Sequence, residues 1–365
     1  MSATSEDVAR LAGVSTATVS RALRAVNGVS PSTRERVLAA VAELGYVSSP
    51  AASRLAGGRT GTVAVVVPYI TRWFFGQVVS GAESVLREQG LDLLLYNLGG
   101  PGGRERYFSK QALHKRVDAV LVLCLPLSDA ELQALSGLQV PVVMVGADVE
   151  GFPSVRIDDV SGAAIAAQHL VNLGHRRIAL ISGVPDDPMG FTAQGDRRRG
   201  FRDTLVAAGL PVDPGLEAAG YFTLDGGAEA MSVLLGRPEP PTAVFAESDE
   251  MAFGALRTLR RAGLDVPGDV SLVGFDGHEL ADLMDLTTVA QPVYEQGRLA
   301  AELLADALNG RGGERRLSVP TRLIVRGSTR PLRASAPPGE NTPGTSRDPR
   351  GAGPLLRPGA EQPPE

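Results

Sequence analysis

Side chains that could contact DNA gather near the N-terminus, within residues 15–21. Arg21 carries a guanidinium group, which can form two hydrogen bonds to one guanine base. Thr16 and Ala17 are expected to face base edges with it, although alanine offers only an apolar contact, for instance to a thymine methyl group. Hydroxyl groups suited to phosphate contacts lie in the same stretch at Ser15, Thr18 and Ser20. The chemistry predicted for this stretch is recognition of DNA.

Two short helices hinged at Gly13 would position these side chains. Ser5 is expected to cap the first helix and Ser15 the second, and glycine suits the left-handed backbone that ends a helix. The first helix has an apolar face made of Val8, Leu11 and Ala12. In a helix-turn-helix, the second helix enters the DNA major groove with its N-terminus first. The same pattern also fits a plain helical hairpin whose polar face meets only water.

A third helix and a linker follow. The helix starts at Pro31, ends at Gly45 and repeats apolar residues at helical spacing, namely Val37, Leu38, Val41 and Leu44. Residues 46–60 form a linker. A short helix is predicted in it from Pro50 to Ala56, and a helix of that length does not persist alone in water.

Composition points to a soluble protein of a reducing compartment. The 365 residues are 43% hydrophobic and 21% charged, and the single cysteine excludes a disulfide within the chain. We expect that residue, Cys124, to be a small buried hydrophobic side chain. No apolar run is long enough to span a bilayer, and residues 1–20 do not resemble a signal peptide. These features predict a cytoplasmic location.

The net charge is unevenly distributed along the chain. Residues 1–60 carry seven arginines and four acidic residues, a net charge of +3, so the remainder carries −8 of the total of −5. A basic N-terminal segment on an acidic body suits local contact with phosphate groups.

After Thr62, apolar segments alternate with amphipathic helical patterns. The predicted strands are Val63–Pro68, Leu91–Tyr96, Ala119–Leu125, Val140–Val145, Ile178–Ser182, Ala218–Phe222, Thr242–Ala246 and Val270–Phe275. Such strands alternating with helices predict parallel sheets covered on both faces. The number of units predicts two βα domains, with the chain crossing between them near residues 145–155 and 275–292. Ligands of such sheets bind beyond the carboxyl ends of the strands.

Several motifs in a fixed order give the sequence a family signature. They are Asp7–Arg21, Thr33–Val37, Glu43–Tyr46, Leu170–Gly183, Arg197–Phe201, Ser248–Leu256, Val266–Asp276 and Leu286–Pro292. Over residues 4–330 their order resembles the lactose-repressor (LacI) family of transcriptional regulators, whose effector domain is similar to periplasmic sugar-binding proteins.

The resemblance implies an α/β protein in four parts. These are a small all-α helix-turn-helix headpiece at residues 1–46, a hinge with a hinge helix at 47–60, a bilobed effector-binding and dimerisation domain at 61–332 made of two doubly wound parallel-sheet subdomains, and a tail at 333–365. The tail is rich in Pro, Gly, Ser and charge, which predicts disorder. The family also implies a homodimer that represses transcription from near-palindromic operator DNA.

The hinge is implied to fold as a helix on operator DNA, with a leucine wedged into the minor groove. Leu55 matches that leucine and Ala52 lies beside it; an apolar wedge that unstacks a base step would kink the duplex. The sequence departs from the family here, because Ser48-Ser49 replaces the usual Pro-Asn and the proline moves to Pro50. Ser49 can still cap a helix that begins at Pro50.

The resemblance also places a small-molecule effector, a sugar or sugar derivative, between the two subdomains. Arg197 matches the family's cleft arginine and Asp276 an acidic ligand contact; a guanidinium suits vicinal hydroxyls. The other effector candidates are Phe74 and Phe75 at the cleft edge, Phe222 on an aromatic wall, and the polar residues Ser161, Ser248 and Gln291. Asp249 is expected to cap a helix that begins at Glu250.

Other interpretations stay open. The effector could be a protein or a non-sugar ligand. A solute-binding protein is opposed by the headpiece and by the lack of a signal peptide. An enzyme is opposed by the lack of a Walker-type phosphate loop and of paired cysteines, and by the spacing of the four histidines, which does not suit a metal. We therefore predict no catalytic residue, cofactor, metal or membrane contact.

Overall fold

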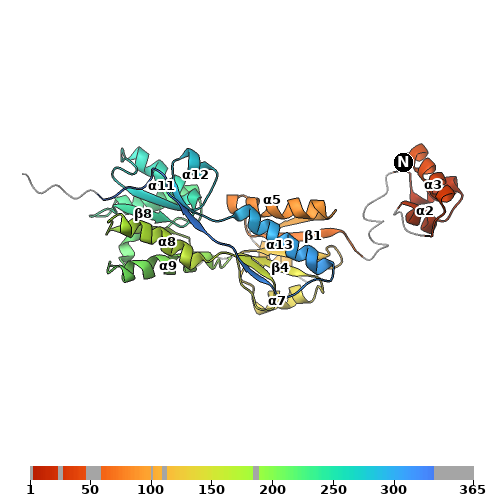
Figure 1. Cartoon of the computed structure of the whole chain (residues 1–365), viewed down its shortest axis with the longest axis horizontal. Coiled ribbons are helices and arrows are strands. Elements are labelled where there is room, and N and C mark those ends of the chain that lie inside the picture. Colours follow the sequence, from red (N-terminus) through yellow and green to blue (C-terminus); the bar gives the residue numbers. More distant parts are fainter. Residues whose placement is uncertain are drawn as a thin grey trace, which may run out of the picture. The chain divides into compact units, whose positions relative to one another are not determined.

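The computed structural model describes residues 3–23, 28–46, 59–99, 102–108, 113–183 and 189–332. Within these ranges a helical headpiece is followed by an α/β body, whose strands form one sheet in each of two lobes (Figure 1). The fold class predicted from the sequence is confirmed. No helix in these ranges is both long and apolar enough to cross a bilayer.

Helices α1 (Ser5–Ala12), α2 (Thr16–Leu23) and α3 (Pro31–Leu44) form the headpiece. Gly13 and Gly45 end α1 and α3 with φ values of 64° and 56°, as predicted. The prediction that Ser5 caps α1 is wrong. The Thr4 hydroxyl accepts from the Asp7 N–H while the Asp7 carboxylate accepts from the Thr4 N–H, and this reciprocal pair makes Thr4 the cap.

The headpiece core consists of small side chains. Its buried members are Val8, Ala9, Ala12, Val19, Ala22, Val37 and Ala40. Leu11 and Leu38, which were predicted to face this core, are 47% and 49% exposed. The inner positions of α1 and α3 are taken by the alanines at 9 and 40, so the leucines are turned towards solvent.

The N-terminal lobe contains a parallel sheet with the strand order β11-β5-β4-β3-β1-β2. Helices α5 (Trp73–Glu88) and α13 (Val293–Leu308) pack side by side on one face, and α7 (Asp129–Ser136) lies on the other (Figure 1). The remaining elements are α6 (Gly103–Phe108) and the strands β1 (Thr62–Val67), β2 (Asp92–Asn97), β3 (Ala119–Leu123), β4 (Val142–Val145), β5 (Ser154–Arg156) and β11 (Arg316–Ser318).

The C-terminal lobe contains a sheet with the strand order β12-β10-β9-β8-β6-β7, in which β12 runs antiparallel to β10. Helix α8 packs with α9 and helix α10 with α11, each pair on its own face of the sheet (Figure 1). The helices are α8 (Asp159–Asn172), α9 (Ala193–Ala207), η1 (Pro214–Leu216), α10 (Leu224–Leu235), α11 (Asp249–Arg261) and α12 (Leu280–Leu283). The strands are β6 (Ile178–Ser182), β7 (Glu217–Ala219), β8 (Ala243–Ala246), β9 (Ser271–Asp276), β10 (Thr287–Ala290) and β12 (Arg322–Ile324).

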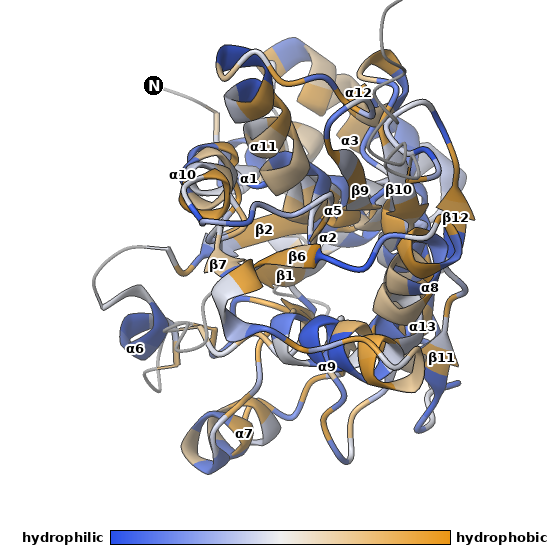
Figure 2. Ribbon diagram, turned by 90° about the vertical axis from the view of Figure 1, so that its left-hand side faces the viewer, coloured by the Kyte–Doolittle hydropathy of each residue, from blue (hydrophilic) through white to orange (hydrophobic). Residues whose placement is uncertain are grey.

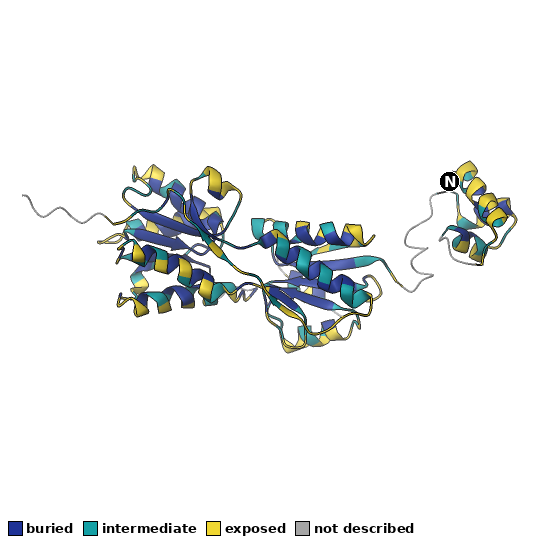
Figure 3. Cartoon of the chain, viewed as in Figure 1, coloured by how far each residue is buried: buried dark blue, intermediate teal, exposed yellow. Residues whose placement is uncertain are grey.

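Both sheets have buried central strands. Strands β3 and β4 are buried along their whole length in the first sheet, as are β6, β8 and β9 in the second (Figure 3). Hydrophobic colour follows strands such as β1 and β6, whereas α9 carries much hydrophilic colour (Figure 2). The prediction of apolar strands covered by helices is therefore confirmed.

Over the described residues the chain passes between the lobes three times. The first passage, at residues 157–158, lies just beyond the predicted range because β5 joins the first sheet before the chain leaves it. The second, at residues 291–292, falls within the predicted range. The third, at residues 319–321 between β11 and β12, was not predicted.

The second passage returns α13 to the N-terminal lobe, where it lies in backbone contact with α5. A Cβ atom at Gly81 of α5 would lie 2.0 Å from the Tyr294 carbonyl oxygen. A Cβ atom at Gly297 of α13 would lie 2.0 Å from the Val78 carbonyl oxygen. Glycine at both positions permits this close crossing, which buries Val293, Ala300, Ala301 and Leu304 in the first lobe.

Candidate functional site

The surface of α2 presents the predicted base-contacting residues. Thr16, Ala17 and Arg21 are exposed, while Val19 and Ala22 anchor the opposite side of the helix in the headpiece core. This arrangement leaves one face of α2 available to a groove of DNA.

The predicted phosphate contacts on α2 also serve the helix itself. The Ser15 hydroxyl accepts from the Thr18 N–H at 3.2 Å and lies 2.9 Å from the Thr18 hydroxyl, so Ser15 caps α2 as predicted. Ser20 is half-buried. Ala52 and Leu55, the predicted hinge contacts, lie outside the described residues.

A cavity of about 80 Å³ lies between the lobes, beyond the carboxyl ends of strands from both sheets. The predicted residues that line it are Phe74, Phe75, Arg197, Phe222, Ser248 and Asp276. Ser161 does not line this cavity, because it sits in the first turn of α8 and its hydroxyl donates to Asp158. Gln291 does not line it either and instead donates to Asp276.

Other lining residues were missed by the sequence analysis, namely Arg72, Cys124, Gly146, Phe191, Thr192, Ala193 and Glu250. Gly146 directly follows β4 and the strand predicted there, so the rule that ligands bind at strand ends could have identified it. Cys124 directly follows β3 but lies inside the predicted strand Ala119–Leu125. Arg72 and Phe191 are brought there by contact between the lobes, which no local pattern predicts.

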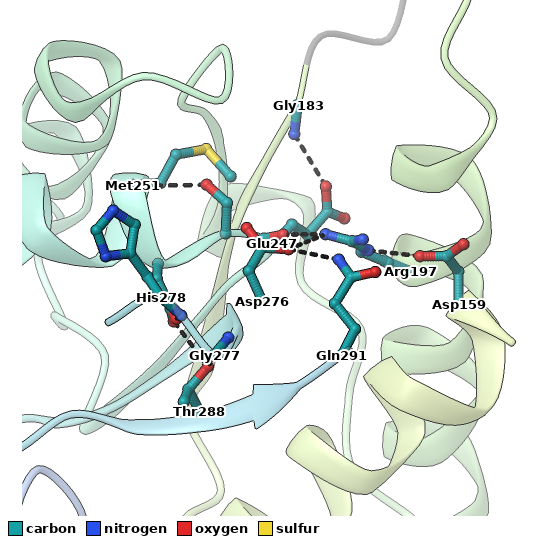
Figure 4. Close-up of polar contacts among 12 residues, drawn as sticks. Asp159, Gly183, Arg197, Glu247, Met251, Asp276, Gly277, His278, Thr288 and Gln291 are labelled. Atoms are coloured by element: carbon teal, nitrogen blue, oxygen red, sulfur yellow. Dashed lines mark hydrogen bonds and ion pairs between the residues drawn. The ribbon is translucent and has the colours of Figure 1, made fainter. Parts of the chain in front are cut away.

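Arg197 is the charged centre of the cavity wall (Figure 4). It lies within α9. Its Nε donates to Asp159 at 2.7 Å, its Nη1 donates to the Glu247 carbonyl oxygen, and Nη1 lies 3.7 Å from Asp276 Oδ1. The guanidinium carbon also lies 3.8 Å from the centre of the Phe275 ring. These contacts fix both the position and the charge of Arg197.

Burial changes the proton affinity of the acids around Arg197. It raises the pKa of Asp276 to about 7, although the Arg197 charge and the Gln291 hydrogen bond act in the opposite direction. It raises the pKa of Glu247 to about 8 against the hydrogen bond from the Gly183 N–H. Burial also opposes the Arg197 charge, but Asp159 and Asp276 outweigh it and keep the pKa of Arg197 above its ordinary value.

Asp276 is tied to the passage between the lobes by a chain of buried amides. Gln291 Nε2 donates to Asp276 Oδ1 at 2.7 Å, and Gln296 Nε2 donates to Gln291 Oε1 at 2.9 Å. Gln296 belongs to α13, which packs on the other lobe. A ligand that contacts Asp276 is therefore linked through one hydrogen bond to Gln291, which lies where the chain passes between the lobes for the second time.

Ser248 begins α11 and faces the cavity. Its hydroxyl oxygen accepts from the Met251 N–H at 3.2 Å, so Ser248 is the cap of α11. The predicted cap, Asp249, is instead the first residue of the helix, and its carboxylate is fully buried. It accepts from the Thr288 hydroxyl at 2.7 Å and from the His278 N–H at 2.8 Å, which joins α11 to the end of β9.

Several cavity residues have a left-handed backbone. Cys124, Phe222 and Asp276 have φ values of 53°, 52° and 121°, a conformation that is costly for residues other than glycine. Cys124 was predicted to be a plain core residue; it is only partly buried and lines the cavity. Burial raises the pKa of its thiol to about 12, which keeps the thiol protonated.

Side chains of the two lobes contact one another beside the cavity. Arg72 Nη2 donates to the Tyr221 carbonyl oxygen at 3.2 Å. The Trp73 ring stacks on His278 with 4.6 Å between ring centres, and its Nε1 donates to Glu279. Phe191 enters the core of the N-terminal lobe and lies 6.1 Å from Phe75 between ring centres.

The cavity offers chemistry for binding a ligand. Its guanidinium, carboxyl and hydroxyl groups suit a hydroxylated ligand, and its phenyl rings suit the C–H face of a sugar ring. No group of three or more His, Cys, Asp or Glu side chains among the described residues could hold a metal ion.

Comparisons with known proteins agree with this arrangement. Residues 4–49 match the family described as "Bacterial regulatory proteins, lacI family", and residues 167–329 match "Periplasmic binding protein-like domain". The chain is 40% identical over 337 residues to the HTH-type transcriptional repressor CytR of Escherichia coli (strain K12). The matched region covers 90% of this chain and 97% of that protein.

Solved structures show the same likeness. The complex of the transcriptional regulator CelR with cellobiose is 39% identical with a TM-score of 0.66, covering 89% of this chain and 99% of that one. The lac repressor dimer bound to operator and the anti-inducer ONPF is 28% identical with a TM-score of 0.79, covering 90% of this chain and all of that one (100%).

Proposed function

The chain belongs to the lacI family of bacterial regulatory proteins, and on that premise we propose that it is a transcriptional repressor controlled by a small hydroxylated effector, a sugar or sugar derivative. It acts in the cytoplasm as a homodimer on a near-palindromic operator. The headpiece at residues 1–46 reads the DNA, the hinge at 47–60 transmits the signal, and the body at 61–332 binds the effector.

One observation supports the proposal that the body binds an effector. Arg197 and Asp276 lie on the wall of a cavity between the lobes, with phenyl rings around them. The CelR relative was solved with cellobiose, which supports a sugar-type ligand for this cavity. Arg197 would donate to ligand hydroxyls and Asp276 would accept from them.

The effector would act through the angle between the lobes. A ligand shifts a conformational equilibrium only as far as it binds one state better than the other. Because Arg72 and Trp73 contact the opposite lobe beside the cavity, a ligand that favours these contacts favours one lobe arrangement. The lobe arrangement would then set the spacing of the two headpieces in the dimer.

The test of DNA recognition compares two arginines of the headpiece. The operator is selected from random duplexes with the full chain, and affinity is measured by fluorescence anisotropy at one salt concentration. Arg21→Ala should lower operator affinity by about 5- to 150-fold, the value of one bidentate base contact. Arg10→Ala removes the same charge from α1, where Arg10 is exposed and paired with Asp7, and should preserve sequence preference. Unchanged operator affinity in Arg21→Ala would refute the role of α2.

A further inference from the structure

A short segment of the C-terminal lobe is buried in the N-terminal lobe. Met189, Gly190 and Phe191 lie just before α9, a helix that packs with α8 on the second sheet. Met189 and Phe191 are nevertheless only 7% and 8% exposed and belong to the hydrophobic core of the first lobe. The other buried members of that core lie in the first lobe itself, α13 included. We call residues 189–191 the latch.

The phenyl ring of Phe191 is surrounded by side chains of the N-terminal lobe. Its centre lies 6.1 Å from the ring centre of Phe75 and 6.2 Å from that of Tyr69, which it meets edge-on. The guanidinium carbon of Arg72 lies 5.8 Å from the same ring centre. These three neighbours come from residues 69–75, where the chain leads from β1 into α5. The ring therefore packs on one short segment of the opposite lobe.

The backbone of the latch is bound to the N-terminal lobe as well. Arg104 of α6 donates from Nη1 to the Met189 carbonyl oxygen at 3.0 Å and from Nη2 to the Pro126 carbonyl oxygen at 2.6 Å. The Glu131 carboxylate on α7 accepts from Nε at 2.6 Å and from Nη2 at 2.9 Å, and this paired geometry fixes the guanidinium. A Cβ atom at Gly190 would lie 3.1 Å from Pro126 Cγ. The latch thus has both polar and apolar contacts with the first lobe.

The burial of the latch outweighs the other contacts between the lobes. Full burial of a methionine or phenylalanine side chain favours the buried state over the exposed state by about 10- to 130-fold. Both side chains of the latch would lose this burial if they left the core of the first lobe. The hydrogen bonds that Arg72 and Trp73 donate to the other lobe are exposed to solvent. One net hydrogen bond favours the bonded state by only about 2- to 12-fold.

We propose that residues 189–191 are a built-in latch that holds the two lobes of the unliganded chain in the arrangement of this structure. A ligand that favours another lobe arrangement has to withdraw the latch from the first lobe. It can do so only as far as its affinities for the two arrangements differ. The inference concerns the lobes alone, so it does not depend on which ligand the body binds.

The single tryptophan of the chain can report on the lobe arrangement. Trp73 begins α5 of the first lobe, and its ring partner is His278 of the second lobe. Movement of the lobes away from each other separates the two rings and exposes Trp73 to solvent. The experiment therefore measures tryptophan emission, and its quenching by acrylamide, in the full chain without ligand or DNA.

Two variants weaken the latch and one preserves it. Phe191→Ala removes the ring, and Met189→Gln keeps the side-chain length but places an amide in an apolar core. Both should move the emission to longer wavelength and increase quenching. Met189→Leu is the matched control, because it keeps the side chain apolar and of similar volume, and it should resemble the wild type. Circular dichroism establishes that each variant is folded, and the two Met189 variants decide the question if Phe191→Ala does not fold.

A double variant distinguishes lobe movement from a local disturbance at Trp73. If Met189→Gln acts by separating Trp73 from His278, it should cause little further shift in a chain that already carries His278→Ala. An equal shift in both backgrounds would overturn the proposal. It would also be overturned if the folded latch variants keep the wild-type emission and quenching, or if Met189→Leu changes them as much as Met189→Gln. Since the test uses no operator and no effector, the proposed repressor function stands or falls separately.

Discussion

The stability of the body should depend on pH through Asp276. Burial raises the pKa of this carboxyl from its ordinary value of 3.8 to about 7 in the folded chain, against the pull of Arg197 and Gln291. Between these values the folded state binds a proton that the unfolded chain has released. The resulting stability is fully present below about pH 4 and is lost as the pH rises through 7.

The size of this effect follows from the two pKa values. Their difference of about 3, at about 1.4 kcal/mol per pKa unit, corresponds to roughly 4 kcal/mol of unfolding free energy. Glu247 adds to the loss, because burial raises its pKa to about 8. Asp276→Asn keeps the oxygen that accepts from Gln291 but cannot titrate. About two of the three pH units lie above pH 5, so the loss of stability between pH 5 and pH 8 should shrink by up to about 3 kcal/mol.

Urea unfolding of the full chain at several pH values from 5 to 8, followed by circular dichroism, measures this change. The matched control is Asp203→Asn, which removes an exposed aspartate from α9 and should leave the pH dependence as in the wild type. If Asp276→Asn loses as much stability between pH 5 and pH 8 as the wild type, the carboxyl is already ionised in the folded state and the reasoning is wrong.

Further predictions concern the crossing of α5 and α13, the stacking of Trp73 on His278, and the hinge. Gly81→Ala should lower the free energy of unfolding by about 1–3 kcal/mol in thermal unfolding, because its Cβ would lie 2.0 Å from a backbone oxygen of α13. Gly76→Ala, in the same helix with open space around it, should not destabilise the chain. Trp73 is the only tryptophan in the sequence, so His278→Ala, which removes its stacking partner, should shift the emission to longer wavelength; an unchanged spectrum would refute the stack. Leu55→Ala should weaken operator binding far more than binding to random DNA, and equal losses would mean that the hinge does not kink DNA.

Local sequence patterns correctly predicted much of the helical structure of the headpiece. Gly13 and Gly45 were correctly predicted as helix ends because a left-handed residue after a helix is a local requirement. The choice between Thr4 and Ser5 as the cap was not predictable in the same way. It depends on which hydroxyl reaches the N–H of Asp7 while the Asp7 carboxylate reaches back.

The elements that the sequence analysis missed depend on distant partners. Strands β5, β10, β11 and β12 read SVR, TTVA, RLS and RLI, so polar residues interrupt any apolar run in them. Helix α13 is stabilised by α5, more than 200 positions earlier in the chain.

The cavity residues also divide into those that local sequence patterns predicted and those that depend on distant parts of the chain. Arg197 and Asp276 were found through motif positions. Cys124 was missed because the predicted strand Ala119–Leu125 runs past the end of β3 at Leu123. Phe191 was out of reach of local reasoning, because it enters the core of the lobe opposite its own sheet.

The return of α13 to the first lobe has a consequence for synthesis on the ribosome. The chain emerges from its N-terminus, yet the first lobe lacks α13 and β11 until residues 293–318 have been made. By then every strand of the second sheet except β12 has already been made. The complete first lobe can therefore form only after most of the second sheet has been made, in contrast to the usual order, in which the N-terminal unit folds first. Ending translation after residue 290 would leave the first lobe without α13 and β11, and most of the second sheet would be present.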